Sequence, residues 1–284
     1  MPYLEIGGLK FYDWNRQGFG LCDVTCAFEH SSDTFFYQAA ARVGIERLAF
    51  WARQYGLGAK TGIDLPAEAP GTIPDNAWKM ETIGEPIYPG EVYLAGIGQG
   101  YDAATPLQML NAYAALANGG TVYSPRIVGD ILGPDGQVVT PFTPEVLGEV
   151  GCSDSILRTM RIAARKVVLS RHTYNLVDLP IVVAGKTGTA EFGEKKHNGK
   201  LPFHSWFVGF VPADPWKTAS DPDGLKAIAR TDSDLAFIVF AYDSNTRGNV
   251  ATEVSKYFLQ LHFGITSDYR LPALLSPRNS YATN

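Results

Sequence analysis

Apolar residues recur every three to four positions from Asp23 to Arg53, a spacing typical of amphipathic helices. The pattern is interrupted near Ser31 and Gly44, where polar residues or glycine replace the expected apolar ones. This part of the chain therefore predicts two or three consecutive helices.

A further helix is predicted by "TPLQMLNAYAALANGG", which begins at Thr105. Thr105 is suited to the N-cap, Pro106 to the first helical position, and Gly119 and Gly120 to the end. The segment at 152–168 predicts another helix, with Ser153 or Asp154 as its cap.

After Leu179 the pattern changes to β-branched and aromatic runs separated by polar loops. The runs "IVVAGKTGTAEF", "HSWFVGFVPA" and "LAFIVFAYDS" predict antiparallel strands. The connection at 214–234 is polar and predicted to be mobile. A final helix is predicted at 249–264, and the tail at 265–284 is predicted to be frayed.

The first 20 residues are rich in glycine and aromatic residues and predict irregular structure, and residues 55–79 predict an ordered loop. A helical block, a strand block and a last helix together predict an antiparallel sheet with helices packed against it. We therefore expect an α/β fold of the α+β kind, in a single domain over residues 1–284.

Composition narrows the function. The 284 residues are 45% hydrophobic and 19% charged, enough for a sizeable core. The net charge is -5 and the 24 Lys and Arg are scattered, which argues against nucleic acid as a partner. The sequence contains no apolar run of membrane-spanning length and no recognisable export signal, so none is predicted for this chain.

Cys22, Cys26 and His30 recur at intervals of four residues, which on a helix places them on one face. Three ligands spread over two helical turns, or ~12 Å, lie too far apart for one zinc ion. With three cysteines in all, a disulfide framework is not expected either. The interpretation favoured is a stripe of small residues facing the core.

Two glycine motifs suggest nucleotide binding but fail on their spacing. A phosphate-binding loop would need glycine five positions before Gly185, and the residue there is Pro180. In "GIGQGY" the third glycine of a dinucleotide motif is replaced by Tyr101. We interpret that segment as a tight backbone turn.

As a strand, "KTGT" has a clear chemical use. Lys186 and Gly188 would share one face, and the glycine would leave the strand edge bare for an extended ligand. Lys186 offers positive charge, Thr187 or Thr189 a contact for a carboxylate, and the Thr189 main-chain N–H a donor for an oxyanion. The alternative is an ordinary edge strand with an exposed lysine.

Ser31 and Asp33, in "SSD", form the other candidate motif. A serine and an aspartate directly before "TFFYQAAARVG" are also what a helix N-cap requires, without any catalysis. Taken alone, this motif favours capping.

The order of these segments resembles the transpeptidase domain of class B penicillin-binding proteins, the elongation type most closely. The resemblance rests on "IGGLKFYDWNRQGFG", "SSDTFFYQAAARVGIERL", "YGLGAKTGIDLPAEAPGTIP", "IGQGYDAATPLQMLNAYAALANGG", "AGKTGTAEF" and "HSWFVGFVPA". It covers most of residues 4–212 and implies the penicillin-binding-protein and β-lactamase-like fold.

The resemblance implies a function in peptidoglycan crosslinking by acyl transfer, with peptide stems and β-lactams as ligands. The family uses a Ser-x-x-Lys nucleophile, a Ser-x-Asn or Ser-x-Asp motif that moves a proton, and a Lys-Thr-Gly strand. By resemblance, Ser31 and Asp33 form the second motif. Lys186 belongs to the third as a catalytic residue, and Thr187, Gly188 and Thr189 bind substrate.

The nucleophile is the missing part. No serine is followed three positions later by lysine; Ser155, with Arg158, comes nearest. The family places this serine before the Ser-x-Asp motif, so we expect this chain to be a C-terminal portion, inactive as printed. Two alternatives remain open: a non-catalytic fragment that binds a peptide or partner, and a relative of serine β-lactamases or carboxypeptidases.

The resemblance also bears on metal, partners and compartment. Some members carry a metal held by Asp, His and Cys; here Asp13 remains, but Phe19 and Ser32 occupy the other two positions, so neither metal nor cofactor is expected. A full-length homologue would face the cell-wall side of the bacterial inner membrane and join cell-elongation membrane proteins. Strands missing from this portion would leave a sheet edge exposed, so poor stability or aggregation is expected.

Overall fold

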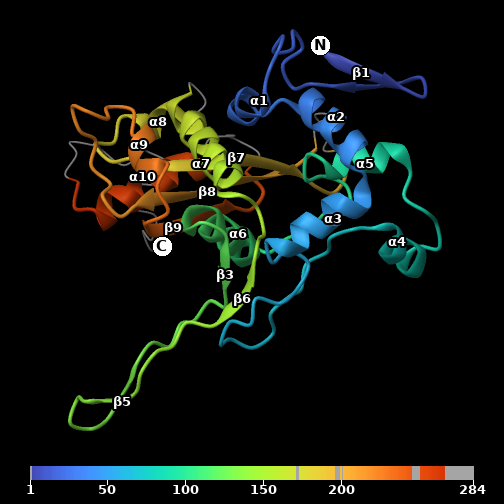
Figure 1. Cartoon of the computed structure of the whole chain (residues 1–284). Helices are drawn as coiled ribbons and strands as arrows, with labels where there is room; N and C mark the ends of the chain where they lie inside the picture. The colour runs from blue at the N-terminus through green and yellow to red at the C-terminus, as the bar shows by residue number, and fades with distance from the viewer. Residues whose placement is uncertain (1, 171–172, 196–198, 200, 245–249, 266–284) are drawn as a thin grey trace, which may run out of the picture.

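The computed structural model describes residues 2–170, 173–195, 199, 201–244 and 250–265. It combines helices with antiparallel sheets, as predicted (Figure 1). The helices are α1 (Val24–His30), α2 (Asp33–Val43), α3 (Ile45–Gln54), α4 (Asn76–Thr82), α5 (Pro89–Ala95), α6 (Pro106–Asn118), α7 (Asp154–Leu169), α8 (Tyr174–Val177), α9 (Leu225–Ile228) and α10 (Val250–His262). The strands are β1 (Tyr3–Ile6), β2 (Leu9–Tyr12), β3 (Thr121–Tyr123), β4 (Ile131–Leu132), β5 (Val138–Thr140), β6 (Val146–Glu149), β7 (Ala184–Glu191), β8 (Phe203–Pro212) and β9 (Ser233–Ala241).

The central sheet has the order β7-β8-β9 and is antiparallel throughout, which confirms the three strands predicted after Leu179. Lys186 lies opposite Val208, which in turn lies opposite Ile238. Within the described residues β7 and β9 each pair with one strand only. Both outer edges of this sheet are therefore free of strand partners.

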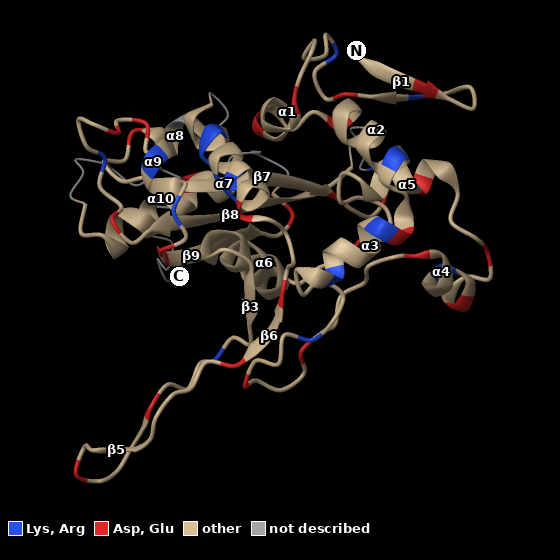
Figure 2. Ribbon diagram, viewed as in Figure 1, with Lys and Arg blue, Asp and Glu red and all other residues tan. Residues whose placement is uncertain are grey.

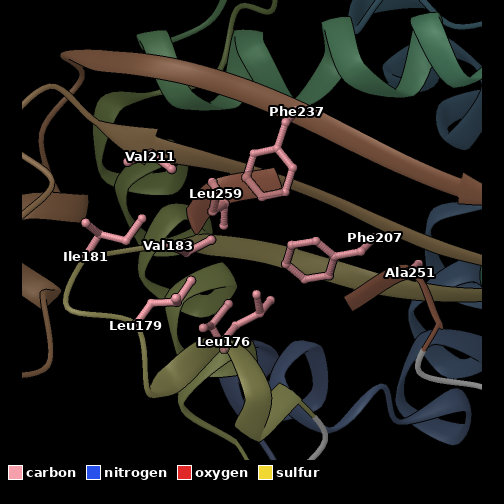
Figure 3. Packing of buried hydrophobic residues seen from close by; sticks show 10 residues of the cluster. Leu176, Leu179, Ile181, Val183, Phe207, Val211, Phe237, Ala251 and Leu259 are labelled. Carbon is pink, nitrogen blue, oxygen red and sulfur yellow. The ribbon is translucent and has the colours of Figure 1, made fainter. Parts of the chain in front are cut away.

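Helices cover both faces of the sheet. On one face Phe207 and Phe237 pack with residues from α7, α8 and α10, all at most 5% exposed; Figure 3 shows this cluster. On the other face Ala184 and Phe210 pack against residues of α6 and α7. The alternation of side chains along each strand assigns Phe207 and Phe210 to opposite faces.

The predicted helices begin and end near the residues that the sequence indicates as caps and breaks. The chain breaks between α1 and α2 at Ser31 and between α2 and α3 at Gly44, as predicted. In α6 the Thr105 hydroxyl accepts from the main-chain N–H of Gln108, and Gln108 Oε1 accepts from the main-chain N–H of Thr105. This capping box satisfies two main-chain donors that the first turn would leave unpaired.

The first 20 residues are not irregular throughout, contrary to the prediction. β1 and β2 form a hairpin in register from Tyr3 opposite Tyr12 to Ile6 opposite Leu9. Gly7 and Gly8 have φ of 59° and 81°, the left-handed values that a tight two-residue hairpin turn requires. The Gly-Gly pair between apolar residues was the sequence signal for this turn.

The 214–234 connection, which the sequence predicts to be mobile, is bonded to the body of the molecule. It contains α9, and two buried arginines of α7 donate to its carbonyl groups. Arg165 Nε donates to the Asp223 carbonyl at 2.6 Å, and Arg161 Nη2 donates to the Ala229 carbonyl at 3.0 Å. Neither contact has a signal in the local sequence.

A long arm leaves the body between β3 and β6 and carries β4 and β5 near its tip (Figure 1). Its apolar side chains are exposed, Ile131 by 52% and Val139 by 67%. Figure 2 shows few charged residues along it. In the described part of the chain, no helix combines the length and hydropathy needed to cross a bilayer.

Most of the predicted tail lies outside the described residues. Its first residue, Ile265, packs against the core at the end of α10. The loop predicted at 55–79 is confirmed up to Asp75, which caps α4 through its side chain.

Candidate active site

Ser31 and Lys186 are in direct contact although 155 residues separate them. Lys186 Nζ donates to Ser31 Oγ at 2.6 Å, so the two sequence motifs meet at one point. The lysine comes from β7, and the serine comes from the junction of α1 and α2. The structure thus brings the "SSD" segment and the "KTGT" strand together.

The backbone at Ser31 adopts an uncommon conformation. Its φ is 56° and its ψ is 47°, in the left-handed region that residues with a side chain rarely occupy. The Ser31 amide donates back to the end of α1, and the chain then turns into α2. A serine held in this strained conformation at a contact between distant segments is typical of functional sites.

Helix capping does not account for the motif in the way the sequence indicated. Ser32, not Ser31 or Asp33, is the N-cap of α2, and its side chain makes no capping bond. Asp33 is the first helical residue, and its Oδ2 accepts from the Trp14 amide at 3.2 Å. The hydroxyl of Ser31 is therefore left to Lys186.

The ionisable groups around Ser31 have displaced pKa values. Burial, together with the negative charge of Asp13, raises the pKa of Asp33 to about 6, although the Trp14 amide and the Lys186 charge act in the opposite direction. Burial lowers the pKa of Lys186 to about 8, and the charge of Asp33 counteracts this in part. The pKa values of Asp33 and Lys186 therefore both lie near neutral pH, where these groups exchange protons with a bound ligand most easily.

Asp13 organises the segment behind this contact. It is fully buried, and its Oδ2 accepts from Ser32 Oγ at 2.8 Å and from the hydroxyl and amide of Thr34 at 2.9 and 3.2 Å. The aspartate, lying just after the first hairpin, thus ties that hairpin to the start of α2.

The residues present do not fit a metal ion. The Ser32 hydroxyl is engaged by Asp13, and Phe19 stacks on His30 with ring centres 5.1 Å apart. No group of three metal-binding side chains occurs among the described residues.

The cysteine stripe predicted from sequence spacing is wrong. Cys22 lies before α1, which begins at Val24, and Cys22 and Cys26 form a disulfide with their Cα atoms 5.3 Å apart. The rule that three cysteines are too few for a disulfide framework overlooked a single local bridge.

Around Gly188 the β7 edge is bare. Gly188 lies opposite Trp206, and a Cβ on the glycine would approach the tryptophan Cβ to 3.2 Å. Thr187 lies next to the lysine, and Thr189 is exposed. Among the described residues of β7, Gly188 therefore leaves the face of Lys186 without a side chain between Lys186 and Ala190.

Gln99 was not predicted as part of this region. Its Nε2 donates to the Thr189 carbonyl at 3.2 Å across 90 residues of sequence. The surrounding glycines, Gly98 and Gly100, have φ of 72° and 83° and form the tight turn predicted for "GIGQGY". The contact itself has no local sequence signal.

The family model for the penicillin-binding protein transpeptidase domain matches residues 3–219. The chain belongs to this family. The match confirms the resemblance inferred from the motifs and identifies the chain as transpeptidase-domain sequence of the penicillin-binding protein 2 type.

Individual relatives agree. The chain is 34% identical over 226 residues to the peptidoglycan D,D-transpeptidase MrdA of Haemophilus influenzae, covering 72% of this chain and 33% of the relative. It superposes on the penicillin-binding protein 2 of Pseudomonas aeruginosa, in a complex with WCK 5153, with a TM-score of 0.74 and 28% identity over 97% of this chain and 57% of that one.

A Helicobacter pylori penicillin-binding protein 2 in complex with MreC gives a TM-score of 0.72 at 25% identity, covering 92% of this chain and 44% of that chain. The chain spans about a third or less of the length of curated relatives it matches, for example 33%, 21% and 34%. These structures confirm the predicted transpeptidase fold, a mixed α/β architecture of the β-lactamase-like kind.

Proposed function

We propose that this chain forms the substrate-binding and proton-transfer part of a peptidoglycan D,D-transpeptidase, as one domain over residues 1–284. The observation that carries the proposal is the 2.6 Å bond from Lys186 Nζ to Ser31 Oγ, made within the fold of a transpeptidase family. Ser31, Asp33 and Lys186 are its catalytic residues, and Thr187, Gly188 and Thr189 bind substrate.

In this proposal the Ser31 hydroxyl is a proton relay. It accepts a hydrogen bond from Lys186, so its own proton is free to pass to a leaving amine while the lysine replaces it. A lysine whose pKa is near 8 releases and regains a proton more easily than an ordinary lysine does. Asp33, through its negative charge, keeps enough of that lysine protonated at neutral pH.

The β7 strand supplies the binding surface. An extended peptide that ends in a carboxylate lies along the free edge, with its carboxylate near Lys186 and the threonine hydroxyls. Gly188 allows the peptide to approach the strand closely, and the Thr189 N–H donates to the oxyanion of the tetrahedral intermediate. Peptide stems of peptidoglycan have this chemistry, and β-lactams are expected to bind at the same edge.

The acyl-forming serine is not part of the printed sequence, which contains no Ser-x-x-Lys. The polypeptide as printed is therefore expected to bind such ligands reversibly and to form no acyl-serine. The experiment exposes the purified chain to a fluorescent penicillin and measures covalent label after denaturation. A stoichiometric label on Ser31 or any other serine would overturn this part of the proposal.

Reversible binding is tested separately by NMR titration with diacetyl-Lys-D-Ala-D-Ala. We expect amide shifts at Thr187, Gly188 and Thr189, which Lys186→Gln should abolish. Lys226→Gln, a change to a lysine on the exposed side of α9, is the matched control and should leave them intact. A titration that moves no β7 amide would refute the proposal.

The missing nucleophile also favours a second candidate, a non-catalytic module that binds peptide or a partner. The Helicobacter pylori relative was solved in complex with MreC, and for this chain we extend the proposal to partners among cell-elongation membrane proteins, on the cell-wall side of the inner membrane. If the chain binds such a partner but not the peptide, the second candidate holds instead of the first.

A further inference from the structure

In the part of the chain that the structure describes, a hydrogen bond to Ser31 and one from Gln99 meet β7 on either side of Gly188. On one side Lys186 Nζ donates to Ser31 Oγ at 2.6 Å, and on the other Gln99 Nε2 donates to the Thr189 carbonyl at 3.2 Å. Between them the strand edge carries no side chain on the face of Lys186. The length of bare edge open to a ligand is thus limited by these two contacts.

The Thr189 carbonyl is a main-chain acceptor that an added strand would need. β7 pairs with β8 on one side, and Gln99 comes from the α5–α6 connection, so this bond lies outside the β7–β8 ladder. In an antiparallel strand the N–H and C=O of a residue point to the same edge. The two main-chain groups of Thr189 therefore face the free edge together, and Gln99 occupies one of them.

The backbone around Gln99 is fixed, so only its side chain is free to leave. The main-chain N–H of Gln99 donates to the Leu94 carbonyl, at the end of α5, at 3.0 Å. Behind it, a Cβ on Gly96 would come within 2.5 Å of the Ala40 Cβ, which shows how closely α5 packs on α2. The side chain itself is half-buried, and within the described residues its hydrogen bond is the one to the Thr189 carbonyl.

We infer that Gln99 is a placeholder for the ligand: its carboxamide occupies the Thr189 carbonyl in the empty site, and an extended peptide must displace it to pair with β7. The inference rests on the proposed function and adds a specificity-determining residue to it. A ligand with a main-chain N–H at the matching position recovers the bond to Thr189, whereas a ligand without one leaves that carbonyl to Gln99.

Displacement has a modest cost, because one neutral hydrogen bond is exchanged for another. Removing the competing amide by Gln99→Ala should therefore tighten binding of diacetyl-Lys-D-Ala-D-Ala by roughly three- to tenfold, the range expected for one net hydrogen bond. The matched control is Asn111→Ala, since the Asn111 amide makes the same kind of bond to the Tyr123 carbonyl, away from β7. That variant should bind like the unaltered chain.

The test follows the Gln99 side-chain NH₂ resonances and the dissociation constant in one NMR titration of the full chain. The inference predicts that these resonances move to the values of a free amide at saturation, and that Gln99→Ala binds more tightly. Peptide binding with unmoved Gln99 resonances, or with unchanged or weaker affinity in Gln99→Ala, overturns the inference alone. If neither protein binds the peptide, the proposed function fails and the placeholder role with it.

Discussion

Asp13 lies close enough to Asp33 for its negative charge to raise the pKa of Asp33, and burial of Asp33 acts in the same direction. The two carboxylates reach the start of α2 by different routes. Asp13 bonds Ser32 and Thr34, and Asp33 accepts from the amide of Trp14, the residue next to Asp13. The buried carboxylate therefore both positions the Ser31–Asp33 turn and adjusts its acidity.

Replacing Asp13 with Asn should lower the pKa of Asp33 by roughly one unit, because one of its two causes is removed. The Asn oxygen can replace Oδ2, and the nitrogen falls where Oδ1 has no hydrogen-bond partner among the described residues. The pKa of Asp33 is measured from its carboxyl ¹³C shift during a pH titration. Asp214→Asn, on an exposed loop, is the control. If the pKa of Asp33 is the same in Asp13→Asn as in the unaltered chain, burial alone raises it.

The left-handed backbone at Ser31 predicts an unusual order of stabilities. Ser31→Gly and Ser31→Ala both lose the bond from Lys186, but only glycine adopts this φ without strain. The glycine variant should therefore be more stable than the alanine variant by about 1 kcal/mol, measured by urea unfolding.

The same pair of substitutions at Ser155, inside α7, provides the control for Ser31. There alanine should be the more stable, because glycine weakens a helix. Equal stabilities of the two Ser31 variants would show that the strain is absent in solution.

Asp102 provides a prediction about pH. Burial raises the pKa of Asp102 from 3.8 to about 7, so the folded protein favours the neutral acid at this position. A group with a raised folded pKa contributes stability below its unfolded pKa and loses it as the pH rises through the folded value. That loss should occur between 3.8 and about 7.

Asp102→Asn removes the ionisation, so the variant should be no more stable than the unaltered chain near pH 4, and its gain in the free energy of unfolding should appear only at higher pH. It should grow to roughly 2 to 4 kcal/mol at about pH 8. Thermal unfolding across this range measures it, with Asp214→Asn as an exposed control. An advantage that is the same at every pH would contradict the assignment to Asp102.

How far the sequence alone predicts this molecule depends on the range of the interaction. The breaks at Ser31 and Gly44, the capping box at Thr105 and the strands after Leu179 follow from local caps and periodicity, and the structure has all of them. The contact between Ser31 and Lys186 joins segments 155 residues apart, and only the family resemblance predicted that these motifs act together.

Other features were missed for two different reasons. The Gly7–Gly8 hairpin had a clear turn signal that the composition of the first 20 residues obscured. By contrast, the Gln99 bond to Thr189 and the Arg165 bond to Asp223 connect side chains to distant carbonyls, and a carbonyl has no residue identity. Such contacts depend on tertiary packing and cannot be read from local pattern.

We expect the arm between β3 and β6 to drive association more directly than an exposed sheet edge, which the sequence led us to suspect. Ile131, Leu132, Val138 and Val139 on the arm are each more than half exposed. A two-stranded ribbon with apolar side chains on both faces is marginally stable in water and tends to pair with other chains.

Replacing residues 131–140 with Asn-Gly should remove that source without weakening the fold. Ile131 lies opposite Thr140, and the Phe142 amide donates to Asp130 Oδ1 at 2.6 Å, so the chain on either side of the replaced residues is close enough for a two-residue turn. We expect less concentration-dependent light scattering and a melting temperature within a few degrees of the original. A matched variant with Thr at those four apolar positions keeps the arm's length and should give the same result. If scattering persists in both variants, a free edge of the central sheet rather than the arm drives association, because β7 and β9 are unaltered in each.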